Sequence, residues 1–227
     1  MALTHITKSR YRQTDTKKHV SLRDQAYDTL KKMIITCALR PGDVLAETEL
    51  SLQLAVGRTP IRQALDRLLG DGLVEVIPRK GTIVKPVSLD EIFNIIDVRL
   101  VNEIYSVRRA AERASPDVIA KLRDSLDDML VAIHSHDIRT LSELDQKFHS
   151  LIAGATRNAV LGDLLQNLHE RSARMWFISL STNEQHLRIC DEHTAIVDAI
   201  AQHDADLAEQ AMRAHIESFS VNITRQG

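Results

Sequence analysis

The chain has 227 residues, which is enough for one large or two modest domains. Its apolar share of 44 % is ordinary for a globular protein, and aromatic residues make up only 4 %. No apolar run approaches the ~18 residues that span a bilayer, and the first residues lack the apolar centre of a signal peptide. Two distant cysteines, Cys37 and Cys190, argue against a disulfide framework. We therefore expect a soluble, cytoplasmic protein.

The net charge of −2 hides an uneven distribution of charged residues. Residues 1–87 contain 15 Lys and Arg against 9 Asp and Glu, whereas residues 88–227 contain 14 against 22. The first part is therefore basic and the second acidic, which is typical of a nucleic-acid module joined to another unit.

Helix-breaking residues divide the chain in the same way. Four of the five prolines and five of the eight glycines precede residue 88, so the segment that follows should be nearly all helix. Ser88 can cap the next helix, with Glu91 three residues on. We predict a disordered basic arm at 1–20, a DNA-binding domain at 21–87, and a helical effector-binding and dimerisation domain at 88–227.

The first folded segment reads as three helices and a hairpin. Apolar residues from Leu22 to Ile34 recur at helical spacing, a Pro-Gly turn follows at 41–43, and a second helix covers about 48–55. Thr59 and Pro60 predict the start of a third helix, with Thr as N-cap and Pro at the first helical position. Short strands then flank a basic tip at 78–81. This order predicts a winged helix-turn-helix.

The second segment reads as six helices joined by short loops. Their apolar residues recur at three- and four-residue steps, as Leu161, Leu164, Leu165 and Leu168 do, and such stripes are typical of a bundle core. The fold class is therefore mostly α, an N-terminal winged helix-turn-helix plus a C-terminal all-α antiparallel six-helix bundle. The predicted helices span roughly 89–113, 116–134, 138–154, 158–181, 184–202 and 205–223.

Candidate DNA-contacting residues gather at the start of the third helix and at the hairpin tip. Free backbone amides and the helix dipole at that start favour phosphate, and arginines there can fork onto guanine. Gly81 permits the tight turn of the tip. The alternative is a winged helix that contacts only protein. The candidates are Arg58, Thr59, Arg62, Gln63, Arg79, Lys80 and Gly81.

Residues 21–86 resemble the GntR family of bacterial transcription regulators. The stretch Gly57-Arg58-Thr59-Pro60-Ile61-Arg62-Gln63-Ala64-Leu65 carries the resemblance. It departs from the family pattern at Gly57, where Ser is usual, and at Gln63, where Glu is usual; Ala55 replaces a glycine. The resemblance implies sequence-specific binding to double-stranded DNA.

Four side chains in the helical domain have a spacing that suits a metal ion. Asp145 and His149 lie four residues apart and so share one helix face. His193 and His215 each lie 11 residues from a turn near residue 204. In an antiparallel pair they would stand at the same height, ~16 Å from the turn. One carboxylate and three imidazoles suit a divalent transition metal. The alternative is that these histidines are solvated or packed in the core, as we expect for His134, His136, His169, His186 and His203.

The segment 89–222 resembles the effector domain of the FadR subgroup, in its shorter, VanR-like, six-helix form. Metal-binding members use Asp-x-x-x-His and two later histidines, which fall on Asp145, His149, His193 and His215. Their first helix carries Arg and Glu four apart, here Arg99 and Glu103. The resemblance implies a small organic acid as effector, its carboxylate near the metal. Arg99 is the candidate second anchor; the alternative is a salt bridge to Glu103.

These features lead us to expect a dimeric regulator that represses transcription, binds an inverted repeat and responds to a small carboxylate. Zinc is the first expectation for the metal, with nickel and manganese as alternatives. Two other functions stay open. The metal itself could be the signal, or the site could be that of a metal-dependent hydrolase. The chain has no H-E-x-x-H, and Glu192 should point about 100° away from His193 on the helix.

Overall fold

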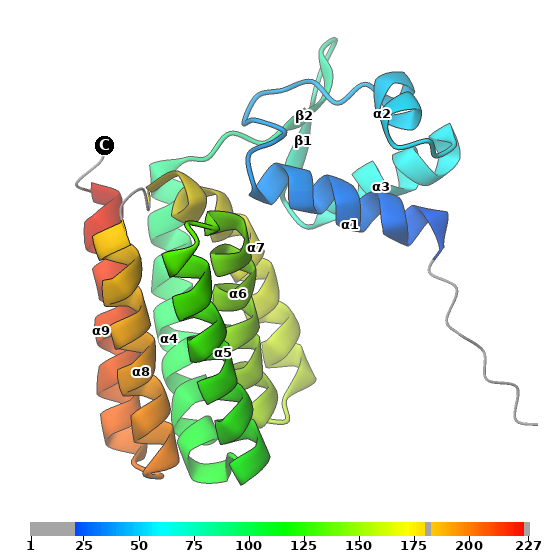
Figure 1. Ribbon diagram of the computed structural model, residues 1–227. Helices are drawn as coiled ribbons and strands as arrows, with labels where there is room; N and C mark the ends of the chain where they lie inside the picture. Colours follow the sequence, from blue (N-terminus) through cyan, green and yellow to red (C-terminus); the bar gives the residue numbers. More distant parts are fainter. Residues whose placement is uncertain (1–20, 180–182, 225–227) are drawn as a thin grey trace, which may run out of the picture.

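The computed structural model describes residues 21–179 and 183–224. The arm expected at residues 1–20 lies outside this range. The N-terminal part is the predicted winged helix-turn-helix, and it lies beside a bundle of long helices (Figure 1). Its elements are α1 (Leu22–Ile35), α2 (Glu47–Gln53), α3 (Arg58–Gly70), β1 (Val74–Ile77) and β2 (Gly81–Val84).

Helix α3 begins earlier than the sequence predicts. Gly57, not Thr59, is its N-cap, and no side chain caps it. Gly57 adopts an extended conformation (φ −59°, ψ 159°), so Arg58 is the first helical residue. Pro60 is therefore the third helical residue. It is tolerated there because the first-turn amides have no partner within the helix.

The wing is a short antiparallel hairpin. Val74 pairs with Val84 and Ile77 with Gly81, which leaves residues 78–80 as the tip. Arg79 (φ 68°) and Gly81 (φ 92°) both lie in the left-handed region. Gly81 therefore permits the tight turn, as predicted, because a residue with a side chain would be strained at this backbone conformation.

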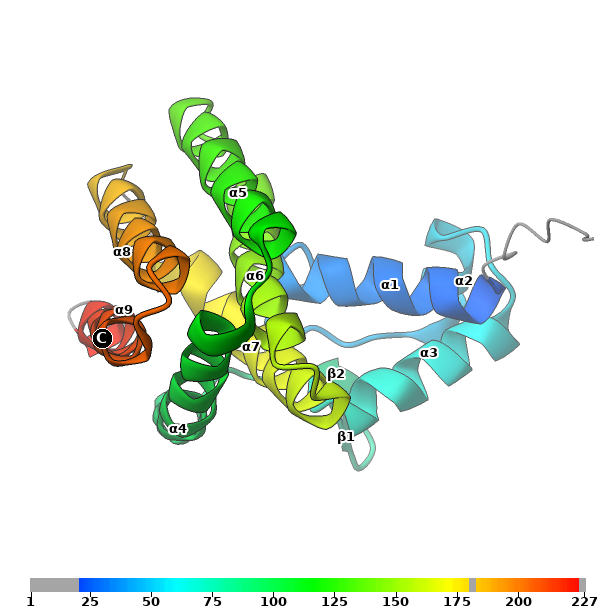
Figure 2. The same ribbon diagram turned by 90° about the horizontal axis from the view of Figure 1, so that it is seen from below.

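Within residues 88–179 and 183–224, the C-terminal part consists of six helices, as predicted. Ser88 caps the first of them by accepting a hydrogen bond from the Glu91 amide. The helices run roughly parallel or antiparallel to one another, and Figure 2 shows several of them nearly end-on. They are α4 (Leu89–Arg113), α5 (Pro116–His134), α6 (Ile138–Ala155), α7 (Ala159–Ser179), α8 (Asn183–Ala201) and α9 (Ala205–Thr224).

The bundle core contains most of the predicted apolar stripe of α7. Leu161, Leu165 and Leu168 are buried, but Leu164 is 41 % exposed, so its assignment to the core was wrong. At about 100° per residue, Leu164 lies ~60° to one side of Leu161. It therefore falls at the edge of the buried face.

Helix α7 also contacts the DNA-binding part. Lys31 Nζ on α1 lies 2.7 Å from Glu170 Oε1, and both side chains are largely buried. Asn167 Nδ2 donates to the carbonyl oxygen of Asp71, and Arg174 Nη1 donates to the carbonyl oxygen of Lys85. One helix of the bundle thus forms several polar contacts around the winged domain.

Candidate DNA interface and metal centre

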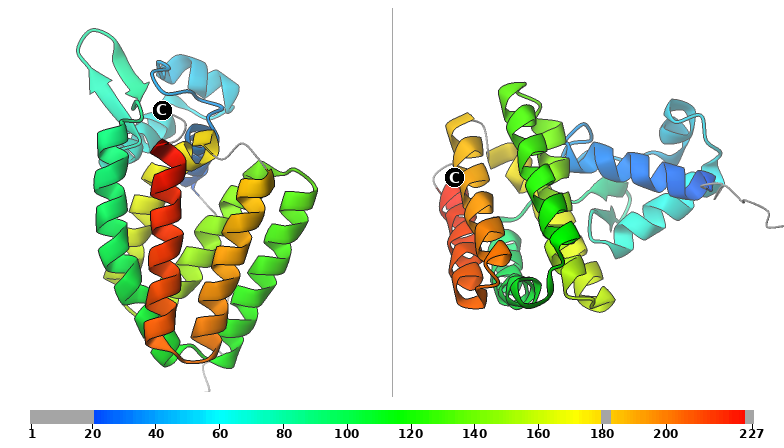
Figure 3. Two further views of the ribbon diagram at one scale, coloured as in Figure 1. Left: turned by 90° about the vertical axis from the view of Figure 1, so that its left-hand side faces the viewer. Right: turned by 60° about the horizontal axis from the view of Figure 1, so that its bottom comes forward.

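The predicted DNA-contacting residues of α3 are exposed together at the start of that helix. Arg58, Thr59, Arg62 and Gln63 all lie on its solvent side, while Ile61 and Ala64 face the core. Figure 3 shows the hairpin and α2 at one end of the molecule, beyond the bundle. The face around the start of α3 is therefore not covered by the helical domain.

Arg62 has a partner in the free protein. Its Nε and Nη2 each lie 3.0 Å from a carboxylate oxygen of Glu47 on α2, a bidentate pair. The hydrogen bond from Arg62 lowers the pKa of Glu47 below its ordinary value. The pair holds the guanidinium between the start of α2 and the second turn of α3, and a DNA group would compete with Glu47 for it.

The hairpin residues form a second exposed group. Arg79, Lys80 and Gly81 are all exposed at the tip of the wing. This group lies on the hairpin and the first group lies on α3. A winged helix-turn-helix uses these two elements to contact different parts of a duplex.

The four candidate metal ligands come together in the centre of the bundle. Asp145 and His149 are on α6, His193 on α8 and His215 on α9, and one ligand atom from each lies within 4.8 Å of all the others. His215 Nε2 is 3.3 Å from both His149 Nε2 and His193 Nε2. His193 Nε2 is 3.5 Å from Asp145 Oδ1. The structure thus places side chains from three helices around one point.

Two carboxylates lie beside the Nδ1 atoms of two of the three imidazoles. His149 Nδ1 lies 2.6 Å from Glu103 Oε2, and His215 Nδ1 lies 3.0 Å from Glu192 Oε2. A carboxylate beside Nδ1 favours the tautomer with hydrogen on that atom. Both Nε2 atoms then present lone pairs to the same small space, and a shared cation is the favourable way to satisfy them.

The spacing suits a first-row metal ion. Ligands bound at ~2.0–2.1 Å in a tetrahedron lie about 3.3–3.4 Å apart, close to the separations among the imidazole nitrogens. His193 is fully buried, and burial, with repulsion from His215 and His149, holds its pKa well below the ordinary value. The neutral ring needed for coordination is therefore favoured.

Behind His149 lies a buried cluster of charged and polar side chains that includes His169. Arg99 Nε is 2.6 Å from Glu103 Oε1, and His169 Nε2 on α7 is 3.3 Å from that same oxygen. Burial alone would raise the pKa of Glu103, but Arg99, His149 and His169 hold it well below its ordinary value. Burial and then Arg99 lower the pKa of His169 to about 4, so this ring is neutral near pH 7.

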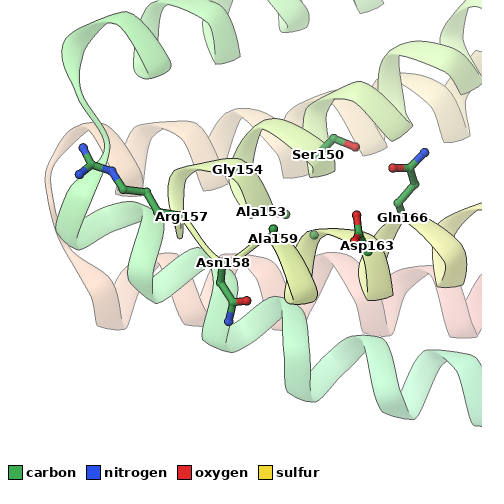
Figure 4. A pocket seen from close by; sticks show the side chains of 9 residues that line it. Ser150, Ala153, Gly154, Arg157, Asn158, Ala159, Asp163 and Gln166 are labelled. Atoms are coloured by element: carbon green, nitrogen blue, oxygen red, sulfur yellow. The ribbon is translucent and has the colours of Figure 1, made fainter.

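The space beside the candidate ligands is small. One cavity of about 20 Å³ is lined by Arg99, Asp145, His215 and Asn222 among others. A second, of about 10 Å³, lies on the side of His169 and shares Arg99 and Asp145. A larger hollow of about 440 Å³ lies at the α6–α7 turn, where Figure 4 shows Asn158 and Asp163 on its wall. None of the candidate ligands lines that hollow.

Comparison with known proteins decides the family. Residues 22–84 match the model of bacterial regulatory proteins of the gntR family, and residues 94–218, more than half of the chain, match the FCD domain. The chain belongs to the GntR family. The relatives of this GntR protein are named as transcriptional regulators, not as enzymes, so the hydrolase alternative finds no support among them.

Two curated relatives and one solved structure illustrate the likeness. The HTH-type transcriptional repressor RspR of Escherichia coli is 27 % identical over 202 residues, 89 % of each chain. The Nta operon transcriptional regulator of Aminobacter aminovorans is 30 % identical over 188 residues, 82 % of this chain and 86 % of that protein. The structure titled E. coli McbR/YncC has a TM-score of 0.83 at 22 % identity and covers 91 % of this chain and 99 % of its own. The last of these shows the fold.

Two side chains at the candidate metal centre of this GntR protein were not assigned to it from sequence. His169 was expected to be solvated or packed in the core; it is buried, and it also lies beside Glu103. Its helical spacing from Leu165 and Ser172, both on the buried face of α7, was the available signal. Glu192 does point away from His193, but it reaches His215 on the neighbouring helix. No helix in the described ranges is long and apolar enough to cross a membrane.

Proposed function

We propose that this GntR regulator is a metal-containing repressor that binds an inverted-repeat operator as a dimer and senses a small organic acid. The observation that carries the proposal is the convergence of three imidazoles and one carboxylate beside a buried arginine. This centre lies in a chain whose winged domain exposes basic residues for DNA.

The metal would be held by Asp145, His149, His193 and His215. Zinc is the first choice because three imidazoles and a carboxylate at tetrahedral spacing suit it; nickel and manganese are the alternatives. A bound divalent ion supplies a positive centre that can accept an oxygen of an anionic effector. Glu103 and Glu192 orient two of the imidazoles from behind.

DNA would be bound by the exposed residues of α3 and the wing. Arg58, Thr59, Arg62 and Gln63 would enter the major groove, and Arg79, Lys80 and Gly81 would approach the adjacent backbone or minor groove. Two such helices reading two half-sites require a two-fold dimer. The relative RspR is named as a transcriptional repressor, which supports repression as the proposed effect on transcription.

Helix α7 supplies a physical connection between the effector centre and the DNA-binding part. His169 contacts Glu103 at the centre, and the next residue, Glu170, pairs with Lys31 on α1. A shift of α7 caused by a ligand at the centre would change this interdomain contact. The ligand can act only through different affinities for the two arrangements.

The experiment is an operator-binding titration on the full-length protein loaded with one equivalent of zinc. The operator is first selected from random DNA, and small carboxylates are then added. We expect at least one to lower operator affinity five-fold or more. If chelator-treated protein binds the operator and responds to acids as the loaded protein does, the metal has no part in sensing.

A second candidate function is that the metal itself is the signal. The observation that favours it is the small size of the cavity beside the ligands, about 20 Å³, which is room for about one water. In that case zinc alone, with organic acids removed by dialysis, would change operator affinity. The leading proposal expects that change only when an acid is also present.

A further inference from the structure

Glu47 is a carboxylate next to the basic residues at the start of α3, and the proposed function gives it no part in DNA binding. It is the first residue of α2, and its side chain is 32 % exposed. Both of its oxygens accept hydrogen bonds from Arg62, so the carboxylate lies on the face that carries the candidate DNA-contacting residues of α3. An exposed ion pair contributes little to folding stability. Its larger effect is on the donors and acceptors that this face presents to DNA.

The ion pair leaves one edge of the Arg62 guanidinium free. A guanidinium has five N–H donors, and Glu47 accepts from Nε and from one hydrogen of Nη2. The second hydrogen of Nη2 and one hydrogen of Nη1 lie along the adjoining edge, and neither has an acceptor among the described residues. A DNA group that approaches the Nε side must displace Glu47, whereas a group that approaches the free edge need not.

The free edge and the carboxylate together offer an ordered pattern of hydrogen-bonding groups. Glu47 Oε2 accepts from Arg62 Nη2 and keeps a lone pair for a further donor. In order from Glu47, the pair therefore presents one acceptor, Oε2, and then two donors, Nη2 and Nη1.

The major-groove edge of a G·C pair presents the complementary series. Its cytosine N4 is a donor, and the guanine O6 and N7 atoms that follow are acceptors. An A·T pair presents thymine O4 to the carboxylate and the adenine N6 donor to the guanidinium, so two of the three contacts become unfavourable. The pattern thus discriminates between the two kinds of base pair.

We infer that Glu47 and Arg62 act together as one reader of a G·C pair, in which Arg62 forks onto guanine and Glu47 accepts from the paired cytosine. The inference rests on the proposed function, in which the start of α3 enters the major groove. The hydrogen bond from Arg62 lowers the pKa of Glu47, so the carboxylate stays ionised and able to accept. The same negative charge repels phosphate and so disfavours binding through the DNA backbone at this point.

The test is selection of an operator from random DNA by full-length protein, followed by competition titrations in which each G·C pair is replaced in turn by A·T. Wild type should lose about thirty-fold or more at one G·C pair of each half-site. In Glu47→Gln, which keeps the size of the side chain, that penalty should fall about five-fold, because a charge-assisted contact is lost. The penalties at other positions should stay within two-fold. Arg62→Ala should reduce the penalty at the same base pair.

Glu49→Gln is the matched control. Glu49 is exposed in the same first turn of α2, but it lies two residues on and points ~200° around the helix axis from Glu47. The control removes the same charge from the same turn. It should therefore raise affinity for unrelated DNA by as much as Glu47→Gln does, within two-fold, and change no base preference by more than two-fold.

Circular dichroism establishes that each variant is folded. Unchanged base preferences in folded Glu47→Gln, an equal loss of preference at every position, or an Arg62→Ala effect at a different base pair would each overturn the shared reader and leave the proposed function standing. Failure of the wild type to select any inverted repeat would instead refute the proposed function, and the reader with it. The two kinds of failure are therefore distinguishable.

Discussion

Glu103 should control metal affinity although it does not belong to the proposed ligand set. Its Oε2 lies 2.6 Å from His149 Nδ1, and both side chains are 2 % exposed, so solvent screens the contact little. Replacing Glu103 by Gln removes the charge that fixes the His149 tautomer. Loss of such a supporting partner typically costs 10–100-fold in metal affinity, or about 1.4–2.7 kcal/mol.

The assay is competition for zinc against a chromophoric chelator at fixed pH, on full-length protein. Glu112→Gln is the matched control, because Glu112 lies on the same helix and also pairs with an arginine, at 2.8 Å from Arg109. That pair is half-exposed, and Glu112 lies nine residues, ~13 Å, along α4 from Glu103, so the control should bind zinc within two-fold of wild type.

Folding must be checked in the same experiment, because Glu103→Gln leaves the Arg99 guanidinium without its counter-charge. Burying an unpaired charge is strongly destabilising, but Gln retains an oxygen that can accept from Arg99. Circular dichroism establishes that the variant is helical. A folded Glu103→Gln protein with wild-type zinc affinity would refute the reasoning from tautomer control.

Three further substitutions test separate parts of the account. Arg62→Ala should weaken specific operator binding by ~1–3 kcal/mol in a gel-shift titration, the loss of one bidentate base contact; unchanged affinity would remove Arg62 from the reading set. His193→Ala should lose most of the bound zinc by elemental analysis, since one imidazole of three is deleted; equal occupancy would reject the ligand set. Phe148→Ala should lower the free energy of unfolding by about 3–5 kcal/mol in a urea titration, because the ring is fully buried and stacks on His193 at 4.2 Å. Leu164→Ala, at an exposed position, is its control and should cost far less.

Helix geometry explains why the sequence could bring the candidate ligands together. Asp145 and His149 are one turn apart, so any helix places them side by side. His193 and His215 are placed at one height by equal distances from the turn at 204, and the structure shows that turn between α8 and α9. These inferences need only the helix period and the antiparallel connection.

The parts that sequence could not supply depend on how helices pack against one another. His169 reaches Glu103 only because α7 packs against α4 and α6 with that face inward, which its own spacing suggests but does not determine. Glu192 supports His215 across the α8–α9 contact. The N-cap at Gly57 was missed because the extended backbone at this glycine starts the helix before the better capping residue, Thr59.

The placement of α7 bears on how much free energy an effector must supply. His169 and Glu170 are consecutive, so their side chains point ~100° apart, one to the Arg99–Glu103 cluster and one to Lys31. Gln166 shares the Glu170 oxygen that Lys31 contacts, so this pair is ordered from both sides. A largely buried, charge-assisted hydrogen bond contributes about 1.5–3 kcal/mol. An effector that prefers the displaced arrangement by about 100-fold supplies ~2.7 kcal/mol. Binding at the centre could therefore release one such interdomain contact without unfolding either domain, and α7 is the helix on which both events would meet.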